Sequence, residues 1–209
     1  MNIAIIPARS GSKGIPNKNI IDFMGKPLIY WSILNAKSAK CIDRVIVSTD
    51  SFEIAKISKF YGAEVLIRPT ELASDETKTI DVLKFHSKEI VDFRNLFVLQ
   101  PTSPLRKKSL IDDCYLSYIK NKSTNLATGY ICKQIEFGTH LNKRRQEIEG
   151  FFYDDGSLYI LPKDLIDKGI WSGNTPYLYI NEKQFTYEID DYLDLFILKQ
   201  LFKQYHNDF

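Results

Sequence analysis

The sequence has little cysteine and almost no charge imbalance. Its three cysteines, Cys41, Cys114 and Cys132, are odd in number and far apart. This spacing fits neither a disulfide framework nor a paired zinc motif, and it favours a reducing, cytoplasmic compartment. With 28 basic and 26 acidic residues the net charge is +2. No global field therefore attracts a nucleic acid polymer or an anionic membrane surface, and any polyanion site must be local.

Long apolar runs are also missing. No stretch approaches the roughly 18 residues that a membrane span requires, and the amino terminus begins with a strand rather than a basic and apolar leader. We therefore expect a soluble protein with no membrane partner. A chain of 209 residues can bury roughly 70% of its unfolded surface. We expect a single domain over residues 1–209.

Residues 1–120 alternate short β-branched runs with longer amphipathic ones. Strands are predicted at Asn2–Ile6, Arg44–Ser48, Glu64–Ile67 and Asn95–Leu99, and helices at Leu28–Lys40, Phe52–Tyr61, Thr79–Val91 and Ser109–Asn121. Ser51 and Ser109 are candidate helix N-caps. The alternation is typical of β-α-β units, and right-handed crossovers make this an α/β fold, with a doubly wound, mostly parallel sheet and helices on both faces.

The rhythm changes after Thr124. A strand-like run and a polar stretch lead to a second strand-like run, in which Asp154-Asp155-Gly156 predicts a turn. The later segments are predicted as extended and then helical, over residues 177–188 and 191–204.

A glycine-rich loop follows the first strand and reads Pro7-Ala8-Arg9-Ser10-Gly11-Ser12-Lys13-Gly14-Ile15-Pro16-Asn17-Lys18-Asn19. Open α/β sheets bind ligands at the carboxyl ends of their strands, and backbone amides beside small residues can approach phosphate oxygens. Arg9, Lys13 and Lys18 supply positive charge that a purely structural turn would not need. The loop matches neither the dinucleotide fingerprint nor the Walker motif, but its chemistry favours triphosphate binding over a plain connection.

Two more loops follow predicted strand ends. Residues 98–106 carry two prolines that stiffen the chain, and Gln100 and Ser103 are expected to point into the same crevice as the first loop. In residues 68–75, Arg68 has the planar fork that can hydrogen-bond a base edge. A plain strand exit and a solvated loop are the structural alternatives for these two segments.

Acidic residues cluster near the end of the chain, where residues 188–191 read Glu-Ile-Asp-Asp. The strand period places Glu188 and Asp190 on one face and turns Ile189 toward the core. Two carboxylates on one side suit Mg²⁺, which takes the rest of its shell from water and substrate phosphates. Helix capping by Asp190 or Asp191 is an equally open alternative.

Other residues with titratable side chains carry less information. Asp50, which ends the strand-like run Val45–Asp50, is a further acidic candidate. The three histidines show no ligand spacing, so no catalytic role is predicted for His86, His140 and His206.

As a set, these loops resemble the acylneuraminate cytidylyltransferase family, whose members activate sialic acid and related nonulosonic acids as CMP-sugars. The similarity covers nearly the whole chain, through Ile5–Pro16, Lys18-Asn19, Gly25–Leu28, Val45–Asp50, Arg68–Asp75 and Leu99–Arg106. It implies a nucleotide-diphospho-sugar-transferase-like fold and CMP transfer from CTP to the anomeric hydroxyl of a sugar acid, with release of pyrophosphate. It further implies Mg²⁺ as cofactor and a homodimer.

The resemblance also implies roles for individual residues. The nucleotide-binding positions are Ala8, Arg9, Ser10, Gly11, Lys13, Lys18, Asn19, Arg68 and Thr79. The positions implied for the acceptor sugar are Gln100, Arg145 and Tyr159. Asp190 and Glu188 fall where the family carries an Asp-x-Asp metal pair, and the residues implied in catalysis are Arg9, Lys13 and Asp190.

The chain departs from the family at several positions. Glu188 lengthens one arm of the metal pair, and Asp155 adds negative charge where relatives usually have asparagine, which leaves the preferred sugar acid open. A usual His-Pro element is absent, so no role is predicted within residues 133–144.

Residues 123–187 correspond to the family's dimerisation excursion, in which each subunit reaches over the active site of the other. For Trp171, Tyr177 and Tyr179, an interface role and a core role are equally open.

Two alternative functions remain at this point. One is a related nucleotidylyltransferase that uses another NTP or another sugar. The other is a nucleotide-binding protein with little turnover, suggested by Asp155 and the missing His-Pro element. The sequence offers no obvious general base for the sugar hydroxyl.

Overall fold

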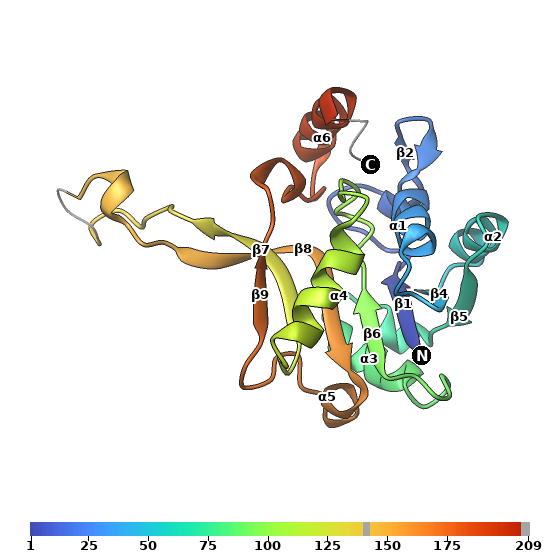
Figure 1. Ribbon diagram of the computed structural model, residues 1–209. Helices are drawn as coiled ribbons and strands as arrows, with labels where there is room; N and C mark the ends of the chain where they lie inside the picture. The colour runs from blue at the N-terminus through green and yellow to red at the C-terminus, as the bar shows by residue number, and fades with distance from the viewer. Residues whose placement is uncertain (140–142, 206–209) are drawn as a thin grey trace.

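The computed structural model describes residues 1–139 and 143–205 (Figure 1). Seven strands form one sheet in the order β5-β4-β1-β6-β8-β7-β9. The strands are β1 (Asn2–Pro7), β4 (Arg44–Thr49), β5 (Glu64–Ile67), β6 (Asn95–Val98), β7 (Leu126–Cys132), β8 (Phe151–Pro162) and β9 (Tyr177–Ile180). Pairings are parallel except those of β8, which runs antiparallel to β6 and β7. The predicted mostly parallel α/β sheet is confirmed.

The helices cover both faces of this sheet. They are α1 (Leu28–Ser38), α2 (Phe52–Phe60), α3 (Thr79–His86), α4 (Leu110–Lys120), α5 (Lys163–Lys168) and α6 (Tyr192–Tyr205). A small ribbon, β2 (Asp22–Phe23) with β3 (Lys26–Pro27), precedes α1. No helix in residues 1–139 and 143–205 is long and apolar enough to cross a bilayer.

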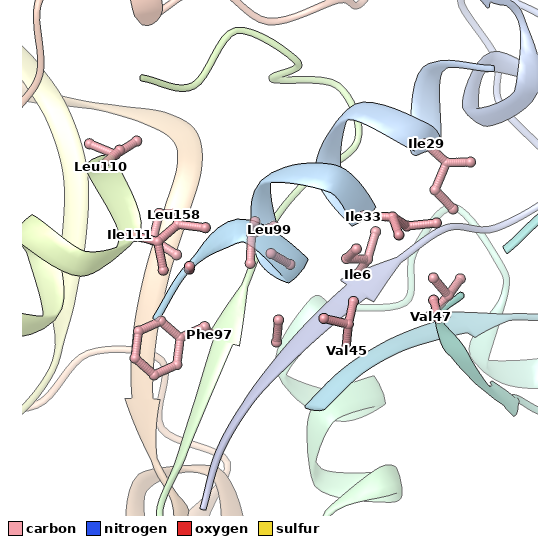
Figure 2. Packing of buried hydrophobic residues seen from close by; sticks show 14 of the residues in the cluster. Ile6, Ile29, Ile33, Val45, Val47, Phe97, Leu99, Leu110, Ile111 and Leu158 are labelled. Carbon is pink, nitrogen blue, oxygen red and sulfur yellow. The ribbon is translucent and has the colours of Figure 1, made fainter. Parts of the chain in front are cut away.

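Alternation along the central strand builds two apolar layers. Ala4 and Ile6 of β1 pack into the layer formed with α1, α2 and α4, whereas the intervening isoleucines pack into the layer formed with α3 and α5. Figure 2 shows Ile29 and Ile33 of α1 beside Ile6 in the first layer. Each fully buried isoleucine stabilises the fold by about 1.5–3 kcal/mol, so these layers fix the strand ends that carry the functional loops.

A third apolar cluster docks α6 near the amino-terminal loop. Its buried members come from separate segments of the chain and include Phe23, Phe185, Ile189 and Leu198. Ile189 is fully buried, which confirms the prediction that its side chain points toward the core. Its burial fixes the backbone on either side, including the two carboxylates that flank it.

The distal halves of β7 and β8 form an arm that extends away from the sheet (Figure 1). Beyond Gly129, which still pairs with Ile180 of β9, the two strands pair only with each other within the described residues, from Tyr130 opposite Tyr153 to Cys132 opposite Phe151. Apolar side chains are exposed along the arm, and Phe137 beyond it is fully exposed.

Three local predictions were wrong. Asp154-Asp155-Gly156 is not a turn, because β8 continues through it; the pairing with β7 shifts register there, and Gly156 takes the glycine-compatible φ of 62°. The side chain of Ser109 caps no helix, whereas Ser51 Oγ does accept a hydrogen bond from the Ile54 amide at 3.3 Å. The extended run predicted after residue 177 ends at Ile180 and is followed by the 3-10 helix η4 (Lys183–Phe185).

Candidate functional site

A cavity of about 500 Å³ opens at the carboxyl ends of β1, β5 and β6. Its walls are the three loops singled out in the sequence, together with Asp190 from the segment before α6. The predicted site residues in its lining are Arg9, Lys13, Lys18, Asn19, Arg68, Thr79, Gln100 and Asp190. Because the strand ends converge, residues distant in sequence share one crevice.

The amino-terminal loop is tied to the neighbouring strand by Asp50. The carboxylate of Asp50 accepts hydrogen bonds from the Ser10 amide at 2.9 Å and from the Ser10 hydroxyl at 2.5 Å. Partial burial would raise the pKa of Asp50, but the bonds from Ser10 lower it below its ordinary value. The Ala8 amide donates to the Ser48 carbonyl at 2.8 Å. Ala8 and Ser10 thus shape the loop, and they do not line the cavity.

Close packing on the other side of the loop requires Gly14. A Cβ at this position would lie 2.1 Å from the backbone oxygen of Asp190. Lys18 reinforces the same approach, because its Nζ donates to the Ile189 carbonyl at 2.9 Å and pairs with Asp190 Oδ1 at 3.2 Å. The loop and the segment before α6 therefore form one continuous wall.

Two cationic side chains of the amino-terminal loop are paired with an acidic residue from a second loop. Asp75 forms ion pairs with Arg9 and with Lys13, the latter over 2.9 Å. Hydrogen bonds from Lys13 and then Arg9 lower the pKa of Asp75. Two of the cations that line the cavity are thus paired with one carboxylate, whereas Lys18 is paired with that of Asp190.

Arg68 lies deeper, with only 6% of its surface exposed. Its guanidinium donates to the Ser48 carbonyl at 3.0 Å and to the Leu72 carbonyl at 3.3 Å. Burial lowers its pKa, although Asp50 acts in the opposite direction. Within the described residues, Arg68 Nε, Thr102 Oγ1 and Ser157 Oγ are buried without a hydrogen-bond partner. The first two belong to residues that line the cavity, where a bound water or ligand could supply the missing partner.

Gln100 is fixed from behind by Arg106. The Gln100 carbonyl accepts from Arg106 Nη2 at 2.6 Å and from Ser32 Oγ at 3.3 Å. These bonds leave the Gln100 side chain in the cavity lining.

The two carboxylates near the end of the chain have different surroundings. Asp190 borders the cavity with an exposed side chain, whereas Glu188 is largely buried against Gly156, whose added Cβ would lie 2.7 Å from Glu188 Oε2. Burial, followed by the negative charge of Asp190, raises the pKa of Glu188 to about 7. Of the two residues considered as helix caps, Asp191 is the one that caps α6, because its Oδ1 accepts a hydrogen bond from the Leu193 amide at 2.8 Å.

This arrangement is chemically suited to a divalent cation shared with a phosphate ligand. Asp190 is free of helix capping, and the negative charges of Asp190, Asp154 and Asp155 act on Glu188 against the single opposing charge of Arg106. No group of three or more His, Cys, Asp or Glu in the described part of the chain has the geometry of a complete metal site. One or two carboxylates plus substrate phosphates are the usual shell of Mg²⁺, so the residues present fit this ion.

The remaining predicted positions lie outside the cavity. Tyr159 is 5% exposed, and its hydroxyl donates to Asp154 Oδ1 at 2.7 Å. Arg145 lies on the arm beside a separate cavity of about 380 Å³. Gly11 is exposed on the loop but is not part of the lining.

Asp155 also differs from its expected place. Its carboxylate is fully buried and accepts hydrogen bonds from Thr128 Oγ1, the Ser157 amide and Asn181 Nδ2 at 2.6–3.1 Å. It supports the irregular pairing of β7 and β8, and the carboxylate exposed beside Tyr159 is that of Asp154.

Sequence reasoning missed several lining residues, namely Ser12, Gly14, Leu72, Ser74, Thr77, Val82 and Thr102. Apart from Thr77, which lies just beyond residues 68–75, the small and hydroxyl-bearing ones lie inside the three loops already singled out. Their position between charged residues was a usable signal, because short polar side chains leave room for backbone amides to reach phosphate oxygens.

Comparison with known proteins gives consistent matches. A family profile described as Cytidylyltransferase matches residues 3–149. The chain is 31% identical to the pseudaminic acid cytidylyltransferase of Campylobacter jejuni, over 98% of this chain and 97% of that protein. It is 30% identical to the N-acylneuraminate cytidylyltransferase of Escherichia coli O18:K1:H7, over 92% of this chain. The chain spans about half the length of the N-acylneuraminate enzymes it matches.

Solved structures share the fold. A CMP:2-keto-3-deoxy-manno-octonic acid synthetase complexed with CTP superposes with a TM-score of 0.77 at 13% identity, covering 97% of this chain and 98% of that one. A cytidylyltransferase from Leptospira borgpetersenii superposes with a TM-score of 0.68 at 19% identity, covering 98% and 87%.

Proposed function

Because this chain belongs to the cytidylyltransferase family, we propose that it transfers CMP from CTP to the anomeric hydroxyl of a nonulosonic acid. The observation that carries the proposal is the cavity into which four cationic side chains converge: Arg9, Lys13, Lys18 and Arg68. Such a site suits a triphosphate, whose charge spreads during transfer. The relatives named for N-acylneuraminate and pseudaminic acid support a nonulosonic acid as the acceptor class.

In the proposed reaction, the anomeric oxygen bonds to the α-phosphorus of CTP while the bond from that phosphorus to the bridging oxygen breaks. Pyrophosphate leaves, and the hydroxyl proton passes to solvent. Arg9 and Lys13 neutralise the departing pyrophosphate, and Arg68 with Thr79 holds the nucleoside. The chain mainly positions its two substrates and stabilises negative charge. No nucleophilic side chain is required.

Mg²⁺ is the proposed cofactor, and Asp190 assisted by Glu188 would hold it next to the triphosphate. When bound, it would supply positive charge that neutralises phosphate oxygens. Lys18 holds the Asp190 carboxylate at the cavity edge through their 3.2 Å contact.

The acceptor is proposed to lie next to Gln100, on the side of the cavity toward Tyr159. Arg145 does not line this cavity; it lines a separate one together with Lys183, Thr186 and Tyr187. We propose a homodimer in which the arm carries Arg145 to the partner's site. The exposed Phe137, Phe151 and Tyr153 supply apolar surface for that contact.

The proposal is tested by incubating the purified protein with CTP, MgCl₂ and either N-acetylneuraminic or pseudaminic acid. Pyrophosphate release and a product with the mass of the CMP-sugar are expected. A parallel panel of ATP, GTP and UTP tests the base, and EDTA tests the metal. Turnover with another NTP in place of CTP would favour a different nucleotidylyltransferase. Tight CTP binding without pyrophosphate release from any sugar acid would favour a nucleotide-binding protein with little turnover.

A further inference from the structure

Asp75 lies where an anionic ligand of the loop is expected. Its two carboxylate oxygens contact separate cations, Arg9 Nη2 and Lys13 Nζ. In the part of the chain that the structure describes, neither cation forms another ion pair. These are the two side chains that the proposed function assigns to pyrophosphate. A carboxylate between two cations takes the same kind of position as a phosphate group.

Asp75 reaches these cations from a second loop, which borders the cavity. It lies on the turn between η2 (Thr70–Leu72) and α3. The hydroxyls of Ser74 and Thr77 contact each other across this turn at 2.8 Å, and Thr77 Oγ1 donates to the Glu71 carbonyl at 3.2 Å. Ser74 and Thr77 also line the cavity. The turn therefore holds Asp75 over the loop.

The contact is exposed and thus easily exchanged. The side chain of Lys13 is 80% exposed, and those of Arg9 and Asp75 are 31% and 35% exposed. Exposed ion pairs contribute little to stability, so an anion with more charge can displace the carboxylate. Asp50 provides the contrast, because its hydrogen bonds to Ser10 shape the loop and leave both cations available.

We propose that Asp75 competes with the pyrophosphate part of the nucleotide for Arg9 and Lys13. This inference rests on the proposed function. A triphosphate carries enough charge to replace the carboxylate, whereas CMP lacks the phosphates that reach these cations. Asp75 thus weakens the binding of CTP and pyrophosphate without affecting CMP, and it returns to the cations as pyrophosphate leaves, which favours product release.

Isothermal titration calorimetry on the full chain tests this inference with three probes in MgCl₂: CTP, inorganic pyrophosphate and CMP. Asp75→Asn should tighten the binding of CTP and pyrophosphate by roughly three- to tenfold, since two exposed ion pairs are removed. CMP affinity should stay within about twofold. In turnover assays, the inhibition constant of pyrophosphate should fall by the same factor. Glu76→Gln is the matched control, because it removes a neighbouring exposed charge that forms no ion pair with Arg9 or Lys13 in the described residues.

Three results would overturn the inference. Unchanged CTP binding in Asp75→Asn would mean that the carboxylate does not compete, and weaker binding would mean that it orders the cations for the ligand. Equal tightening of CMP, or an equal effect of Glu76→Gln, would mean a general charge effect. If the wild-type protein turns over CTP but Asp75→Asn has the same affinities for CTP and pyrophosphate, this inference fails and the proposed function stands. If the wild-type protein binds no CTP, the proposed function fails with it.

Discussion

Arg106 offers a test of how the fold supports its active-site loops. The guanidinium is fully buried and donates to Ser157 O at 2.9 Å, Ser32 Oγ at 2.9 Å and Gln100 O at 2.6 Å. It thereby joins α1, the loop after β6 and strand β8. Burial lowers its pKa to about 9, opposed by the negative charges of Asp155 and Glu188. The side chain is therefore still charged at neutral pH.

Arg106→Met should lower the free energy of unfolding by about 3–5 kcal/mol, because three hydrogen bonds from one charged donor are lost, at about 1.5–3 kcal/mol each, and the cost of burying the guanidinium offsets part of their sum. The Ser157 carbonyl loses this donor, and the buried carboxylates lose their nearest compensating charge. For a chain of 209 residues, each kcal/mol shifts Tm by about 2–4 °C, so a fall of about 6–20 °C is expected.

Urea unfolding followed by circular dichroism measures this loss, and an unchanged m-value shows that only stability has changed. Arg106→Lys should lose less, because it keeps the charge but not the three-way fork. Lys107→Met is the matched control, since its ion pair with Glu182 is exposed and should be worth less than about 1 kcal/mol. A loss below about 1 kcal/mol in Arg106→Met would refute the reasoning, because the cost of burying the guanidinium would then cancel its bonds.

Asp190→Ala should reduce kcat/KM by more than tenfold, or about 1.4 kcal/mol, with the circular dichroism spectrum unchanged; a smaller loss would contradict its role as a metal ligand. Gly14→Ala should lower kcat/KM more than Gly11→Ala. A Cβ at position 14 would lie 2.1 Å from the Asp190 backbone oxygen, whereas a Cβ at position 11 would have only Arg9 Nη1 nearby, at 3.8 Å. Equal kcat/KM values for the two variants would contradict this. For Glu188, the folded-state pKa is raised from 4.5 to about 7, so its stabilising contribution is complete below about pH 4.5 and is lost as the pH rises through about 7. Glu188→Gln should therefore gain up to about 3 kcal/mol in metal-free stability relative to wild type between about pH 5 and pH 8, and urea titrations showing a pH-independent difference would disprove it.

Local sequence patterns were sufficient to predict the layers of the fold. The β-branched run of β1 and the helical spacing of α2, with Ser51 as its cap, depend on neighbours in sequence. Ser109 was wrongly assigned because a serine before a helix satisfies the pattern without making the bond. The sequence Asp-Asp-Gly at 154–156 suits a hairpin turn as well as a strand irregularity, and only pairing with β7 decides between them.

Convergence of the three loops was also predictable, because parallel strands end at one edge. Contacts between side chains across the cavity could not be predicted in this way. The bonds of Asp50 to Ser10 and of Asp75 to Lys13 join residues that no periodicity relates. The position of Arg145 on the arm equally depends on how far β7 and β8 pair beyond the sheet. Such long-range geometry is set by packing rather than by local sequence.

The wall formed by Lys18 and Ile189 ties the beginning of the chain to a residue 171 positions later. During synthesis, the amino-terminal loop leaves the ribosome long before the segment that completes its surroundings. A nascent chain that stops at residue 149, where the family match ends, would display the cations but lack Asp190. A nucleotide bound as proposed would then stabilise only a polypeptide that includes the segment with Asp190, so its binding would report that the two ends of this wall have come together.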